Sequence, residues 1–183
     1  MSLARIRIAA RLLAVAAMAA LTAGCFQPMY AEHADGTPGL RDKLLGVELP
    51  PIEKPNASPE ARIGVEIRNA LAFKMYGTAT GTTPTHKLVL KFATTRSSLL
   101  VSPTTGLPTS ENFGVDAQYN LVEISSNKSV MTGTTFSRVT YDMPGSYQRF
   151  SRTRALRDAE DRAAQEIADN IQTRLASFFF AGT

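Results

Sequence analysis

The residues around Cys25, the single cysteine of the chain, form the most specific chemical pattern in this sequence. Cys25 follows Leu21-Thr22-Ala23-Gly24 at the end of an apolar run. Ahead of that run stand three basic residues and no acidic one: Arg5, Arg7 and Arg11. A positive segment, an apolar segment and small residues at a cleavage site are typical of a secretory signal peptide. We therefore predict that residues 1–24 are a signal peptide that is removed.

The position of Cys25 directly after the small residues resembles a bacterial lipobox. There the thiol accepts a diacylglyceryl group before cleavage, and the new N-terminus is then acylated. Thr22 stands where a large aliphatic residue is usual. The alternatives are an ordinary signal peptide with a chance cysteine, or an uncleaved anchor, but the apolar stretch 12–23 is about half of the ~20 residues that a spanning helix needs. We predict a lipoprotein with S-diacylglycerol and N-acyl groups on Cys25 and no other cofactor.

Removal of the signal peptide changes the charge balance. The full chain has 20 basic and 16 acidic residues, and three of the basic residues lie in the leader, so 17 against 16 leave a net charge of about +1. This balance gives little reason to expect a nucleic-acid partner. The remaining 159 of 183 residues suffice for one domain with its own core. With no second cysteine and no tryptophan, we expect packing of aliphatic residues and a few phenylalanines to hold it together.

Residues that could support catalysis are scattered along the chain. The sequence contains no glycine-rich phosphate loop and no metal-ligand cluster, and its two histidines, His33 and His86, lie far apart. We interpret both imidazoles as exposed or locally hydrogen-bonded. Neither a nucleophile signature nor a pair of carboxylates indicates nucleophilic or acid–base chemistry. We predict that the protein is not an enzyme and holds no metal.

Two further patterns are compatible with binding. Four arginines gather at the expected start of the last helix: Arg149, Arg152, Arg154 and Arg157. They form either a solvated face or a contact site for phosphates, carboxylates or a partner protein. The second pattern is a Thr/Ser-rich sheet with an uncharged turn from Thr104 to Ser110. A polar sheet face of this kind either meets solvent or docks inside a hydrophilic channel.

The first elements follow from turn residues and periodicity. We expect residues 25–43, which are rich in Pro and Gly, to be a lipid-anchored tether. Alternation from Leu44 to Leu49, ended by Pro50-Pro51, predicts a short strand. Ser58-Pro59-Glu60 predicts the start of a helix that Gly77 closes. Its apolar stripe excludes three charged residues that we interpret as a solvated outer face: Arg62, Glu66 and Lys74.

Three alternating segments predict strands over 88–92, with a possible continuation to 101, over 115–121 and over 130–141. Turns are predicted at 102–108 and 125–128. In the last strand, alternation divides the residues between two faces, with Thr132, Thr134 and Phe136 on one and Thr135, Ser137 and Val139 on the other.

A long amphipathic helix is predicted over residues 151–179. Its apolar stripe consists of Leu156, Ala159, Ala163, Ile167, Ile171, Leu175 and Phe178. The order strand, helix, three strands, helix predicts an α+β fold in a single domain over 44–183. We expect a mixed or antiparallel four-stranded sheet with two helices packed on one face.

The run from Ala23 to Tyr30 resembles the mature start of the LPS-assembly lipoprotein (LptE) family in its alphaproteobacterial form. There a Gly-Cys pair is followed by an aromatic-X-Pro-Leu-Tyr stretch, and Met29 replaces the leucine here. The resemblance continues in the element order and in the run from Arg157 to Ala164 of the last helix, so that it covers essentially the whole mature chain.

The resemblance implies a lipoprotein held in the outer membrane at its periplasmic face. It would act as plug and assembly factor of a large β-barrel of the LptD type, in a complex that delivers lipopolysaccharide to the cell surface. The alternative function is an auxiliary lipoprotein of an ABC-type lipid transport system, which would bind periplasmic partners rather than fill a barrel. A stand-alone envelope lipoprotein is a third possibility.

The resemblance also implies contact with lipopolysaccharide through basic residues on the sheet and its loop. The turn from Pro103 to Ser110 contains no basic residue. The candidate residues in this chain are therefore Lys91, Arg96 and Arg138, of which Arg138 lies at a corresponding position on the last strand.

Overall fold

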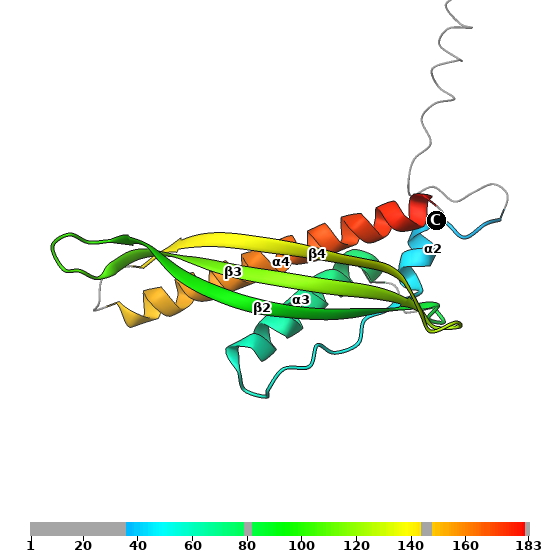
Figure 1. The fold of residues 1–183 in the computed structure, drawn as a ribbon, viewed down its shortest axis with the longest axis horizontal. Coiled ribbons are helices and arrows are strands. Elements are labelled where there is room, and N and C mark those ends of the chain that lie inside the picture. Colours follow the sequence, from blue (N-terminus) through cyan, green and yellow to red (C-terminus); the bar gives the residue numbers. More distant parts are fainter. Residues whose placement is uncertain (1–35, 79–81, 144–147, 182–183) are drawn as a thin grey trace, which may run out of the picture. The chain divides into compact units, whose positions relative to one another are not determined.

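The computed structural model describes residues 36–78, 82–143 and 148–181. All helices and strands of the described residues belong to one unit, Leu40–Thr183 (Figure 1). Cys25, the predicted signal peptide and the predicted tether up to residue 35 lie outside the described residues, so the lipid anchor remains a prediction.

The first elements of the unit are helix α2 (Leu40–Leu45) and the two-residue strand β1 (Val47–Glu48). The predicted strand over 44–49 is therefore wrong over most of its length, and α2 begins inside the segment predicted as a tether. The physical reason is that Leu40 and Leu44, one helical turn apart, are both buried. Burial of both side chains in the core stabilises a helix over this segment, although the residues from Leu44 to Leu49 alternate as in a strand.

Helix α3 (Pro59–Tyr76) begins and ends where its flanking residues predict. The hydroxyl oxygen of Ser58 accepts a hydrogen bond of 3.0 Å from the backbone N–H of Ala61, which satisfies one of the free donors of the first turn. Gly77 ends the helix with a φ of 60°, a conformation that a residue without Cβ adopts without strain. The buried side of α3 contains Ile63, Gly64, Ile67, Leu71 and Met75.

The sheet adds three long strands, β2 (His86–Val101), β3 (Pro108–Glu123) and β4 (Lys128–Asp142), in the order β1-β2-β3-β4. The pair β1–β2 is parallel and the other two pairs are antiparallel, which confirms a mixed four-stranded sheet. The strands extend further than alternation predicts, because backbone pairing continues through their polar and turn-like ends.

Helix α4 (Arg149–Ala181) and α3 lie on the same side of the sheet, as predicted (Figure 1). We call the sheet face toward these helices the inner face. On β3 it carries the odd-numbered residues, and Phe113, Val115 and Leu121 are completely buried. Burial of one such side chain contributes roughly 1.5–3 kcal/mol. On α4, small residues such as Ala159 and Ala163 allow close approach to the strands.

The opposite side of the sheet, here the outer face, is covered by no helix of the described residues. From Thr132 to Thr140 on β4 it consists of the even-numbered residues, which are exposed, while Ser137 and Val139 on the inner face are buried. The predicted division of β4 into two faces is confirmed. Among the described residues, no helix combines the length and the apolar character needed to cross a bilayer.

Candidate functional site

The three candidate basic residues do not lie together. Register places Lys91 opposite Gln118, and Arg138 opposite Gly114, on the outer face of the sheet. Arg96 pairs with Phe113, so its side chain belongs to the inner face. Lys91 and Arg96 are five residues apart on one strand, and side chains an odd number apart point to opposite faces.

Arg138 is held in place by several contacts on the outer face. Its guanidinium forms an ion pair of 2.7 Å with Asp116 and donates to the backbone carbonyl oxygens of Val115 (3.2 Å) and Ser137 (2.9 Å). Gly114 makes room for this arrangement, because a Cβ atom there would lie only 3.0 Å from Cδ of Arg138. The side chain is nevertheless accessible, since 40% of its surface is exposed.

A shallow hollow of about 470 Å³ lies beside this ion pair on the outer face. Its lining includes Lys91, Asp116, Gln118, Thr134 and Phe136. Phe136 is 66% exposed, and in the described part of the chain Lys91 has no carboxylate partner. An aromatic ring, an ammonium group and hydrogen-bonding side chains on one open surface can hold an anionic polar ligand.

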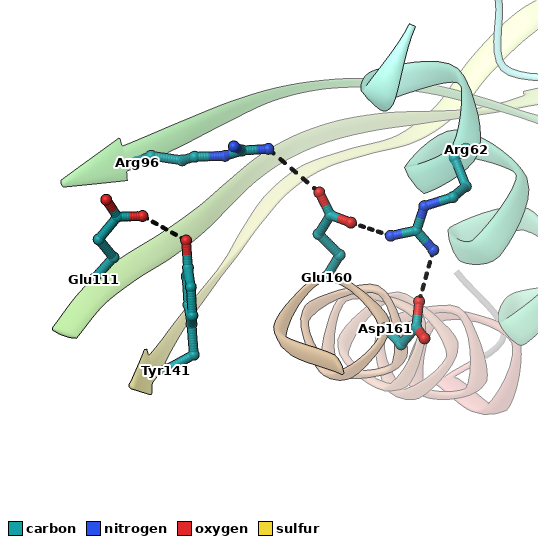
Figure 2. A network of polar contacts seen from close by, with 6 residues as sticks. All are labelled: Arg62, Arg96, Glu111, Tyr141, Glu160 and Asp161. Atoms are coloured by element: carbon teal, nitrogen blue, oxygen red, sulfur yellow. Dashed lines mark hydrogen bonds and ion pairs between the residues drawn. The ribbon is translucent and has the colours of Figure 1, made fainter. Parts of the chain in front are cut away.

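Arg96 instead joins a polar network between the sheet and the helices, which Figure 2 shows. Glu160 on α4 is buried, with one carboxylate oxygen 3.4 Å from Arg96 and the other bonded to Arg62 of α3. Arg62 also pairs with Asp161 at 3.0 Å. Because a buried carboxylate is tolerated only when it is paired, this network connects β2, α3 and α4.

The pKa of Arg62 reflects its place in this network. Burial lowers the pKa of the guanidinium, but hydrogen bonds to Asp161 and Glu160 and the charges of both carboxylates outweigh burial and raise it. Arg62 therefore stays cationic beside Glu160. The interpretation of Arg62 and Lys74 as merely solvated is wrong, because Lys74 also reaches α4, where it pairs with Asp169 at 2.5 Å.

Tyr141 and Glu111 form a second polar pair in this region (Figure 2). The phenol donates a hydrogen bond of 2.5 Å to the carboxylate. Burial raises the pKa of Tyr141 to about 12, together with the hydrogen bond to Glu111 and its charge. A phenol with this pKa keeps its proton at neutral pH and acts as a hydrogen-bond donor.

His86 is half-buried at the start of β2. Its Nδ1 lies 2.9 Å from the hydroxyl of Thr85, and its ring meets that of Phe179 edge-on at 5.2 Å. Burial lowers the pKa of the imidazole, against the opposing charge of Glu123. The predicted local hydrogen bond is confirmed for His86, whereas His33 lies outside the described residues. In the described segments, no three His, Cys, Asp or Glu side chains are grouped to hold a metal ion.

Glu160 is not among the residues predicted from the sequence, although its position on α4 carries a signal. It precedes Ala163, Ala164 and Ile167 at helical spacing and so lies on the buried stripe of α4. An acidic residue on such a stripe needs a buried cationic partner. The sequence does not show that Arg62 and Arg96 meet it, because these residues come from two other elements.

The geometry defines a small α+β domain with a helix-covered inner face and an open, hydrogen-bonding outer face. The chain belongs to the lipopolysaccharide-assembly family LptE, whose family model matches residues 45–175. The resemblance inferred from the sequence is thus confirmed.

Solved structures share this fold. A crystal structure of a Caulobacter crescentus protein described as a lipoprotein has a TM-score of 0.60 at 23% identity, and covers 79% of this chain and 97% of that one. Rare lipoprotein B from Shewanella oneidensis has a TM-score of 0.51 at 15% identity, with 73% and 93% covered. No curated protein matches the sequence.

Proposed function

We propose that this chain is the outer-membrane lipoprotein subunit of a lipopolysaccharide translocon, where it acts as plug and assembly factor of an LptD-type β-barrel. Membership of the LptE family supports a non-enzymatic lipoprotein role in lipopolysaccharide assembly. The composition of the outer face supports the proposal that the domain fills a barrel.

The outer face has the chemistry that a polar barrel lumen accommodates. Its β4 residues include Thr132, Thr134 and Thr140, and the facing β3 residues include Gln118 and Asn120. The charges of Arg138 and Asp116 offset each other. A surface of this kind can exchange hydrogen bonds with the polar lumen of a barrel.

The proposed anchor is Cys25, with a diacylglyceryl group on its sulfur and an acyl group on its nitrogen. Two or more hydrocarbon chains hold a protein stably at a bilayer, here the periplasmic face of the outer membrane. Cys25→Ser is expected to abolish labelling by radioactive fatty acid and to leave an unprocessed precursor. Labelling that survives the substitution would exclude Cys25 as the lipid site.

For direct contact with lipopolysaccharide we propose Lys91 and Arg138, which share the outer face. We leave out Arg96 because its side chain lies on the inner face and forms an ion pair with Glu160. Neutralising both residues, Lys91→Gln with Arg138→Gln, is expected to weaken retention of lipopolysaccharide by the purified chain roughly tenfold or more. Lys87→Gln on the same strand and face is the matched control, and equal retention by all variants would exclude this assignment.

Photocrosslinking tests the plug role most directly. A photoreactive phenylalanine analogue at Phe136 on the outer face should capture a large outer-membrane barrel in cells. The same analogue at Phe73, which is 72% exposed on α3, measures how much capture depends on the face. Capture of inner-membrane ABC transporter components, instead of a barrel, would favour the auxiliary-lipoprotein alternative.

A further inference from the structure

The turn between β2 and β3 exposes an unusual amount of apolar surface. Four large apolar side chains within nine residues are half or more exposed: Leu99 (50%), Leu100 (63%), Val101 (56%) and Leu107 (50%). We call residues 99–107 the hairpin tip. No charged residue occurs from Ser97 to Ser110. Exposed apolar side chains that cluster in this way are typical of interaction sites.

These side chains do not belong to the core of the domain. Leu88 and Phe92 on the inner side of β2 are buried, but every residue from Thr95 to Val101 is exposed. Register shifts at Ser98/Leu100 and Leu100/Val101 interrupt the alternation, so that three consecutive apolar residues are presented. No described helix covers the tip on either side.

The backbone of the tip satisfies much of its own hydrogen bonding. Ser102 N–H donates to the carbonyl of Leu107 at 2.9 Å, and Gly106 N–H donates to the carbonyl of Ser102 at 2.8 Å. Gly106 adopts a φ of +67° that allows this closed turn. A turn closed in this way can enter a medium of low polarity at reduced cost, because fewer polar groups lose a partner.

A strongly basic segment lies next to this apolar tip. Arg152, in the first turn of α4, contacts the sulfur of Met143, whose backbone N–H bonds to the carbonyl of Thr109. The other arginines of the cluster, Arg149, Arg154 and Arg157, are exposed. Within the described residues, none of the four arginines forms an ion pair. Phe150, 89% exposed, lies among them.

The placement of these arginines is unfavourable within the domain itself. They occupy the first turns of a 33-residue helix whose first turn contains no acidic residue. The N-terminal end of a helix carries a partial positive charge, so cations there are repelled and anions are attracted. An external anion would relieve this repulsion.

We propose that the hairpin tip and the start of α4 together dock onto the surface of an anionic lipid bilayer. Leu99, Leu100 and Leu107 enter the acyl region, and Arg149 and Arg154 meet lipid phosphates. Apolar side chains next to exposed arginines are the combination that interfacial membrane binding requires. A purely apolar protein pocket would leave the four arginines without partners, so the charges favour a lipid surface.

The chain contains no tryptophan, so a tryptophan introduced at one position is the only indole fluorophore. Leu100→Trp introduces a single fluorescent reporter at the tip of the full chain, and Phe73→Trp introduces one at a control site on α3. Both variants are incorporated into vesicles of phosphatidylcholine and phosphatidylglycerol, with or without bromine on the acyl chains. Emission from the tip reporter should shift to shorter wavelength and be quenched by bromine, whereas emission from the control should not.

The charge contribution is tested in the same assay. Arg149→Gln with Arg154→Gln should lower the equilibrium constant for tip insertion roughly thirtyfold in anionic vesicles, and have little effect in phosphatidylcholine alone. Leu107→Trp provides a second reporter if the first variant misfolds, which circular dichroism would reveal.

Two outcomes would overturn the proposal. Solvent-like emission from both tip reporters in anionic vesicles excludes insertion. A shift that needs no lipid and grows with protein concentration assigns the tip to a second copy of the chain, and a shift that appears only with a purified barrel assigns it to that partner. The vesicles contain neither barrel nor lipopolysaccharide, so failure here leaves the plug proposal intact.

Discussion

The inner and outer faces of the sheet are built from the same strands and use the same residue types differently. On the inner face Arg96 reaches a buried carboxylate, Glu160, and links the sheet to both long helices. On the outer face Arg138 pairs with Asp116, which is 48% exposed. The two faces show that the partner of a basic residue on a strand depends on the face to which its side chain points. That face follows from whether the position is odd or even along the strand.

The largest expected effect separates two phenylalanines. Phe113→Ala removes a ring with 0% exposure from the inner face and should lower the free energy of unfolding by about 3–5 kcal/mol. Phe136→Ala removes a 66% exposed ring from the outer face and should change it by no more than about 0.5 kcal/mol. Urea denaturation midpoints measure both, and equal losses would contradict the division into two faces.

The two carboxylates offer a smaller contrast. Glu160→Gln leaves Arg62 and Arg96 without their shared anion and should destabilise the domain by about 1–3 kcal/mol. Asp116→Asn breaks a surface pair and should have an effect of about 0–1 kcal/mol. Thermal unfolding of the two variants provides the measurement. A larger loss for Asp116→Asn would mean that the outer pair, not the buried network, organises the sheet.

Two glycines on the strands test how rigid each face is. A Cβ at Gly133 would clash with the phenol ring of Tyr119, which is buried on the inner face. A Cβ at Gly114 would meet the ends of Thr95 and Arg138, which can rotate into solvent. We expect Gly133→Ala to cost about 1–3 kcal/mol, as overpacking does, and Gly114→Ala to cost less. The unfolding midpoints decide, and the reverse order would contradict a rigid inner face.

The pH dependence of stability should show the smallest effect. The folded-state pKa of Tyr141 is raised from 10.0 to about 12, so between these values the unfolded chain releases a proton that the folded chain keeps. The contribution of Tyr141 to stability is complete below pH 10 and is lost as the pH rises toward 12. In Tyr141→Phe this part of the alkaline decline should disappear. An unchanged decline would show that other groups cause it, such as Tyr76 and Tyr119, whose pKa values burial also raises.

Prediction from sequence succeeded where local chemistry dominates. The hydroxyl of Ser58 caps the first turn, Pro59 suits the first helical position, and Gly77 adopts the positive φ that ends the helix, so the ends of α3 follow from residue type. The division of β4 into two faces follows from alternation alone. The strand predicted over 44–49 failed because two residues one helical turn apart, Leu40 and Leu44, are held by the core, which no local pattern reveals.

The candidate site was only partly predictable for the same reason. Alternation is sufficient to separate Lys91 from Arg96, since an odd spacing on one strand means opposite faces. Contacts between elements far apart in the chain decide which face the helices cover. They also bring a carboxylate on α4 to Arg96. Without these contacts, alternation shows that Lys91 and Arg96 lie on opposite faces but not which face is open.

The sequence by itself predicted the two long helices, the three long strands and the resemblance to the LptE family, because periodicity, caps and short motifs are local properties. The tertiary structure alone decided which basic residues are free. Pairing in the sheet and packing of α3 and α4 set the surroundings of each side chain, and burial and charge act through those surroundings. Arg96 is thereby committed to Glu160, whereas Lys91 stays accessible beside the hollow on the outer face.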